Sequence, residues 1–151
     1  MTSYADTSFV VSLYVPDIHS RTAVTAMGRI EGEVLISAFG EVELANALEL
    51  RLFRKEITAR QAKAAAQAFE QDLLAGVFRL QAIPSAAFEK AKRLARQHTA
   101  LLGTRSLDLI HVATALTLGA TGFLSFDTNQ RKLAHEAGLT VAPKTLGSKT
   151  P

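Results

Sequence analysis

Short apolar runs alternate along this chain with longer segments in which apolar positions recur every three or four residues. The first pattern predicts buried β-strands, and the second predicts helices that bury one face. Strands are expected at residues 2–6, 34–37, 77–83, 121–126 and 139–142. Helices are expected at residues 8–15, 17–31, 40–55, 59–75, 85–100, 105–118 and 128–137.

Helix-capping residues and glycines support these boundaries. Thr58 and Gln61 have the spacing of a capping box, which opens the helix expected at 59–75. Helix stops are predicted at glycines that follow helical segments, namely Gly76, Gly103, Gly119 and Gly138. Because strands that alternate with helices pair in parallel, we predict an α/β fold of three layers around a parallel sheet.

Length and composition limit the possible classes of protein. The chain has 151 residues, which suits one domain, expected here at 1–145, with a frayed tail at 146–151. Without cysteine, it forms no disulfide, no zinc–thiolate site and no cysteine nucleophile. Neither a membrane-spanning apolar run nor a secretory signal is evident, so we expect a cytoplasmic protein without a membrane partner.

Acidic residues lie where predicted strands end or helices begin, and they are the main candidates for chemistry. Asp6, Asp108 and Asp127 are the clearest, with either Glu41 or Glu43 after the second strand. The carboxyl ends of parallel strands share one edge of the sheet, so these side chains could meet in one cleft. Such a cluster is costly without a positive charge, and its hard oxygen ligands suit Mg²⁺ or Mn²⁺.

Each of these acids also has a purely structural explanation. Asp6 and Asp127 are suited to capping the helices that follow them, and Asp108 would complement the dipole of its helix in the first turn. His111, three residues after Asp108, could be a metal ligand. Because its neighbours are apolar, we interpret it instead as a hydrogen-bonded core histidine.

Basic residues are grouped along the sequence, although the net charge is only +3. One group contains Arg51, Arg54, Lys55, Arg60 and Lys63. Another contains Lys90, Lys92, Arg93 and Arg96, and Arg105 follows close to Asp108. Basic flanks beside an acidic cleft would suit a polyanion such as RNA, although solvated helix faces are the simpler explanation for either group.

The order and spacing of several segments resemble those of PIN domains, and in particular of the VapC-type toxin ribonucleases. The resemblance covers nearly the whole chain, and the segments that carry it are 4–14, 43–48, 108–116, 124–127 and 133–141. It assigns the family's acids to Asp6, Glu43, Asp108 and Asp127, which favours Glu43 over Glu41. The family's small hydroxyl residues fall on Ser8 and on Ser125, where many members have threonine.

The resemblance implies a parallel sheet in the order 3-2-1-4-5 and a metal-dependent endoribonuclease that uses Mg²⁺ or Mn²⁺. It also implies a homodimer that is inhibited by a cognate antitoxin protein. Asp6, Glu43, Asp108 and Asp127 would then be catalytic residues and metal ligands, and basic side chains such as Arg105 would position the RNA.

Other classes of protein fit the sequence less well. A catalytically inactive PIN-like module that only binds RNA would favour fewer acids at the cleft. A phospho-receiver domain would need paired acids after the first strand, where Asp6 stands alone. A haloacid-dehalogenase-like phosphatase would need a second aspartate at the position of Ser8.

Overall fold

The computed structural model describes residues 1–144, so the predicted tail at 146–151 lies outside the described residues. Its centre is one parallel sheet with the strand order β3-β2-β1-β4-β5, as predicted. The strands are β1 (Thr2–Ala5), β2 (Glu33–Ser37), β3 (Arg79–Gln81), β4 (Gly122–Leu124) and β5 (Thr140–Ala142). In the central register, Tyr4 of β1 lies between Leu35 and Phe123.

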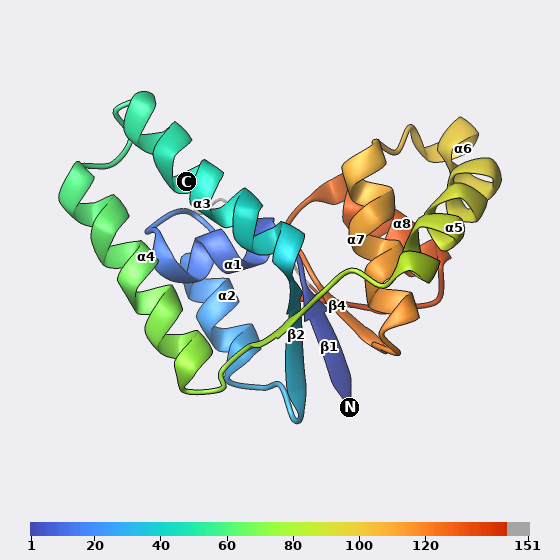
Figure 1. The fold of residues 1–151 in the computed structure, drawn as a ribbon, viewed down its shortest axis with the longest axis horizontal. Coiled ribbons are helices and arrows are strands. Elements are labelled where there is room, and N and C mark those ends of the chain that lie inside the picture. The colour runs from blue at the N-terminus through green and yellow to red at the C-terminus, as the bar shows by residue number, and fades with distance from the viewer. Residues whose placement is uncertain (145–151) are drawn as a thin grey trace.

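Helices cover both faces of this sheet and give the predicted three layers (Figure 1). One face carries α1 (Thr7–Tyr14), α2 (Ser20–Met27), α3 (Ala38–Phe53) and α4 (Ala59–Leu74). The other carries α5 (Ser85–Leu94), α7 (Ser106–Thr117) and α8 (Thr128–Glu136). A π-helical turn η1 (Ala95–Thr99) and α6 (Ala100–Leu102) continue α5.

Three predicted boundaries need correction. The helix expected at 17–31 is only α2, because the Asp17 carboxylate accepts the backbone N–H of His19 and holds a turn before the helix. The strand expected at 77–83 is only β3, because the N–H of Val77 is taken by the last turn of α4. The helix expected at 85–100 runs to Leu102 through the π-helical turn.

Alternation along the strands divides the apolar core into two parts. Ala5 and Leu124 face α1–α4, whereas Tyr4, Leu35 and Phe123 face α5, α7 and α8. Helix α7 is buried along most of its length, and its buried positions include three polar residues, Asp108, His111 and Thr114. No helix within residues 1–144 combines the length and the apolar character needed to cross a bilayer.

Candidate active site

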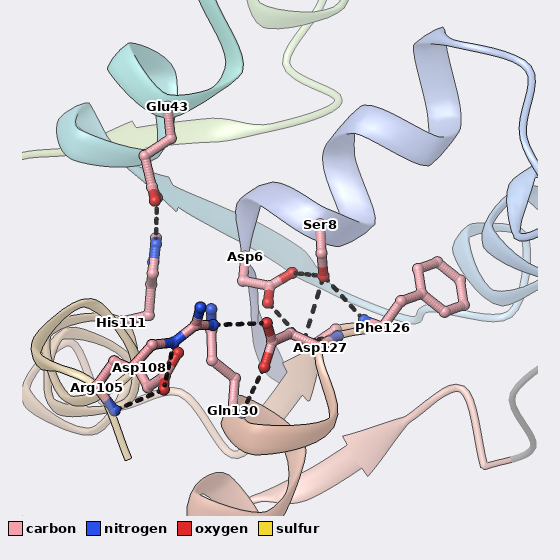
Figure 2. A network of polar contacts seen from close by, with 10 residues as sticks. Asp6, Ser8, Glu43, Arg105, Asp108, His111, Phe126, Asp127 and Gln130 are labelled. Atoms are coloured by element: carbon pink, nitrogen blue, oxygen red, sulfur yellow. Dashed lines mark hydrogen bonds and ion pairs between the residues drawn. The ribbon is translucent and has the colours of Figure 1, made fainter. Parts of the chain in front are cut away.

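The four predicted acids lie at the carboxyl edge of the sheet or at the start of a helix that packs beside it (Figure 2). Asp6 caps α1 directly after β1, and Asp127 caps α8 shortly after β4. Glu43 lies in the second turn of α3, and Asp108 lies in the first turn of α7. The capping roles expected for Asp6 and Asp127 are therefore confirmed, and each carboxylate still has an oxygen directed elsewhere.

Asp6 is the most enclosed of the acids, with no exposed surface. Its Oδ1 accepts the N–H of Phe9 at 3.0 Å and the hydroxyl of Ser8 at 2.7 Å, and its Oδ2 accepts the hydroxyl of Ser125 at 2.5 Å. Burial raises the pKa of the Asp6 carboxyl, while these donors and the nearby His111 oppose the rise. The carboxylate is thus firmly oriented but costly to ionise in the metal-free protein.

The two predicted hydroxyl residues connect Asp6 to the chain around Asp127. The Ser8 hydroxyl accepts the N–H of Phe126 at 3.0 Å, and the Ser125 hydroxyl accepts the N–H of Asp127 at 3.0 Å. Each hydroxyl therefore accepts from the backbone after β4 while it donates to Asp6. Ser8 and Ser125 fix where β4 ends relative to α1, and the mutual position of Asp6 and Asp127 depends on both.

Glu43 is held from two sides at a single carboxylate oxygen. Its Oε1 accepts the hydroxyl of Thr7 at 2.7 Å and contacts Nε2 of His111. Burial alone would raise the pKa of Glu43, but hydrogen bonding and charge from His111, aided by Thr7, lower it overall. Among residues 1–144, Oε2 of Glu43 has no hydrogen-bond partner. These contacts involve Glu43 and not Glu41, the position that sequence reasoning left open.

His111 links Glu43 to the interior of the domain. Its side chain is 1% exposed, and its Nδ1 lies 2.8 Å from the hydroxyl of Tyr4. The Tyr4 hydroxyl donates to Ser37 Oγ at 2.9 Å, and Ser37 caps α3 by accepting the N–H of Gly40. Because an ionised Glu43 can only accept, Nε2 of His111 donates to it.

This chain of contacts refines the sequence interpretation of His111. It is a satisfied core histidine, as expected, but the group that satisfies one of its nitrogens is a candidate site residue. Tyr4, Thr7 and Ser37 were not predicted from the sequence to contribute to the site. The available signal was a polar residue within or beside an apolar run, because a buried polar group needs a hydrogen-bond partner.

Arg105 joins the other two acids. Its Nε lies 3.5 Å from Oδ2 of Asp108, and its Nη2 lies 3.2 Å from Oδ2 of Asp127. The Arg105 backbone N–H also donates to Oδ2 of Asp108 at 2.8 Å. Asp108 is 1% exposed at its side chain, and its Oδ1 is buried without any partner within residues 1–144. A buried, unsatisfied carboxylate oxygen is unusual and points to a missing cation or water.

The donor set fits a hard divalent cation, because it consists of carboxylate oxygens and includes the orphaned Oδ1 of Asp108. As the side chains lie, however, residues 1–144 bring no three acidic or histidine groups close enough together to hold one ion. Arg105 and His111 engage the carboxylates instead, as Figure 2 shows. Within the described residues, basic side chains of the chain itself therefore contact three of the four acids, Glu43, Asp108 and Asp127.

Comparison with known families identifies the fold. Residues 3–136 match the model of the PIN domain. The chain belongs to the PIN domain family. The match spans β1 to α8 and therefore includes all four acids of the site.

Solved structures share this PIN fold at low sequence identity. VapC20 of Mycobacterium tuberculosis, described as a toxin that cleaves the sarcin–ricin loop, is 22% identical, with a TM-score of 0.68 over 91% of this chain and 96% of its own. FitAcB of Neisseria gonorrhoeae is 19% identical, with a TM-score of 0.69 over 92% and 95%. VapBC2 of Rickettsia felis, solved with a DNA fragment from its promoter, is 15% identical, with a TM-score of 0.63 over 93% and 97%. A comparison with curated protein sequences gives no significant match.

Proposed function

We propose that this PIN domain is the toxin of a type II toxin–antitoxin pair and a metal-dependent endoribonuclease. The observation that carries the proposal is the arrangement of Asp6, Glu43, Asp108 and Asp127 around one edge of a PIN-domain sheet. Support also comes from the fold shared with a solved toxin that cleaves RNA and with solved toxin–antitoxin complexes.

The four acids would hold Mg²⁺ or Mn²⁺, with Oδ1 of Asp108 and Oε2 of Glu43 as the oxygens that have no partner within residues 1–144. When bound, such an ion lowers the pKa of water and stabilises negative charge on a phosphate. The fixed orientation of Asp6 between Ser8 and Ser125 would reduce the reorganisation needed for binding. One acid would also orient the attacking water, and Arg105 would contact the RNA backbone.

A second candidate function is RNA binding without catalysis. It is favoured by one specific observation, namely that Arg105 and His111 already contact three of the four acids, Glu43, Asp108 and Asp127. In that case the protein would bind RNA equally well with and without divalent metal, and it would not cleave it.

A matched pair of variants separates these functions. Purified protein should cleave RNA in the presence of Mg²⁺ or Mn²⁺, and cleavage should stop when EDTA removes the metal. Glu43→Gln should reduce cleavage by about a hundredfold or more, as expected for loss of a metal ligand or of its positioning. Glu41→Gln, two residues earlier on α3, should leave cleavage unchanged. Equal effects of the two changes would argue against the assignment of Glu43, and full activity in EDTA would remove the metal from the mechanism.

Partners and location complete the proposal. We expect a cognate antitoxin, a homodimer and action in the cytoplasm. Several apolar residues of α3 and α4, such as Leu44, Leu48 and Phe69, pack in the core and are not free for a partner. Phe53 and Leu74 are 82% and 90% exposed at the C-terminal ends of these helices, and Val42 of α3 is 64% exposed, so apolar surface remains on both helices for a partner. Light scattering should give twice the chain mass of 16.2 kDa.

A further inference from the structure

The Arg105 guanidinium occupies a distinctive position, between two candidate metal ligands that lie on different helices. Its Nε faces Asp108 of α7, and its Nη2 faces Asp127 at the start of α8 (Figure 2). The side chain is 66% exposed, and within residues 1–144 its guanidinium makes no other ion pair or hydrogen bond. These two carboxylates are therefore its only anchors in the described chain.

The two carboxylates need a positive charge in the metal-free protein. Asp108 is almost fully buried, and like charges held together in a site repel each other. Arg105 supplies that charge, and the same carboxylates raise the pKa of its guanidinium. The Oδ1 of Asp108 nevertheless stays buried and unpartnered, because Arg105 reaches only Oδ2. A small cation with several coordination positions could satisfy both oxygens, whereas the planar guanidinium does not.

We propose that Arg105 is a tethered counter-ion that takes the place of the divalent cation in the metal-free protein and competes with it. The inference rests on the metal site of the proposed function. A metal ion would have to displace the guanidinium from Asp108 and Asp127 before it could use both carboxylates.

Of the two basic side chains at the site, only Arg105 can move away from its carboxylates easily. His111 is enclosed and hydrogen-bonded at both ring nitrogens, so it cannot leave Glu43 without disturbing the core. Arg105 has a long flexible stem in solvent, and partly exposed ion pairs contribute little to stability. Its backbone N–H keeps its bond to Asp108 when the side chain moves, so the turn that begins α7 is preserved. A displaced Arg105 stays at the mouth of the cleft, where a phosphate group could receive it.

The test compares Arg105→Gln with Arg60→Gln, which removes the same charge from an exposed position at the start of α4. Titration calorimetry with Mn²⁺, without RNA, should show about fivefold tighter binding to Arg105→Gln than to wild type, which corresponds to roughly 1 kcal/mol for a partly exposed pair. Arg60→Gln should bind Mn²⁺ like wild type. Arg105→Lys, which keeps the charge, should bind more weakly than Arg105→Gln. Binding to Arg105→Gln that is equal to wild type or weaker would overturn the proposal.

A thermal measurement provides an independent readout. In EDTA, Arg105→Gln should melt slightly below wild type, because Asp108 and Asp127 lose their counter-ion, and saturating Mn²⁺ should raise its Tm more than that of wild type. An unchanged melting temperature in EDTA would contradict the counter-ion role. If Mn²⁺ bound none of the variants nor wild type, both the metal site and this inference would fail. Equal Mn²⁺ affinities together with metal-dependent RNA cleavage would overturn the inference alone.

Discussion

On the two sides of the carboxylate site, the acids contact two different basic residues, one buried and one exposed. On one side, Glu43 contacts His111, whose side chain is 1% exposed and whose other ring nitrogen meets the buried Tyr4. On the other side, Asp108 and Asp127 share Arg105, whose side chain is 66% exposed. Both arrangements place an N–H donor against a carboxylate, but only the first is part of the packed core.

This difference decides what each contact can do. A buried hydrogen-bonded partner is expensive to remove, because the groups that it leaves behind remain unsatisfied in a medium of low dielectric constant. An exposed arginine is replaced by water and salt at little cost. The contact between Glu43 and His111 is therefore suited to holding one geometry. The contacts of Asp108 and Asp127 with Arg105 are suited to exchange of the guanidinium for another cation.

The largest expected contrast is in stability. His111→Leu should lower the free energy of unfolding by about 3 kcal/mol, since Tyr4 and Glu43 both lose a partner inside the domain. Arg105→Gln should lower it by less than about 1 kcal/mol, because the ion pair is mostly exposed. Urea titration of both variants in EDTA measures the two values. Equal losses would show that burial does not distinguish the two sides.

A smaller effect is expected one step further along the buried chain. Tyr4→Phe removes a hydroxyl that lies between His111 and Ser37, and should cost about 1 kcal/mol of stability. Tyr14→Phe is the matched control, because the Tyr14 hydroxyl donates to Asp72 at 2.6 Å outside the site. Both variants should lose stability, but only Tyr4→Phe should weaken Mn²⁺ binding in calorimetry. Weaker binding in both would point to a general loss of stability instead of a loss of support for Glu43.

The same contrast explains what the sequence could predict. Asp6 directly follows β1 and Asp127 lies shortly after β4, so local signals placed both at the sheet edge, and their capping roles are confirmed. The parallel sheet followed from the alternation of strands and helices. The boundaries that failed depend on local hydrogen bonds, such as that from His19 N–H to the Asp17 carboxylate. Hydrophobic periodicity carries no information about such bonds.

Contacts between distant residues were beyond sequence reasoning. His111 meets Glu43 across 68 positions and Tyr4 across 107, so neither contact has a local signature. From the sequence, a metal ion was predicted to balance the charge of the acidic cluster, and Arg105 was predicted to contact RNA and not the acids. The pairing of Arg105 with Asp127 depends on how α7 and α8 pack together, which only the tertiary structure specifies.

Asp6 offers a test through pH. Its folded-state pKa is raised by burial, so between the unfolded value of about 3.9 and the folded value the native state binds more protons. Stability should therefore fall as pH rises through that window, and Asp6→Asn should remove this fall and be at least as stable as wild type at neutral pH. Urea midpoints in EDTA, from about pH 4 to pH 8, measure both slopes. A less stable Asp6→Asn at neutral pH would mean that the contacts from Ser8, Ser125 and Phe9 outweigh the cost of burial.

The smallest effect is expected from salt, and it separates the two sides most directly. At about 1 M salt the screening length is roughly 3 Å, comparable with the 3.2 Å between Arg105 Nη2 and Asp127 Oδ2. The stability difference between wild type and Arg105→Gln should then shrink towards zero, because an exposed pair is screened by ions that reach it. The difference between wild type and His111→Leu should persist, because ions do not enter the core around Tyr4 and His111. Urea titrations in EDTA at low and high potassium chloride measure both differences, and an Arg105 effect that survived high salt would show that its contacts belong to the packed structure.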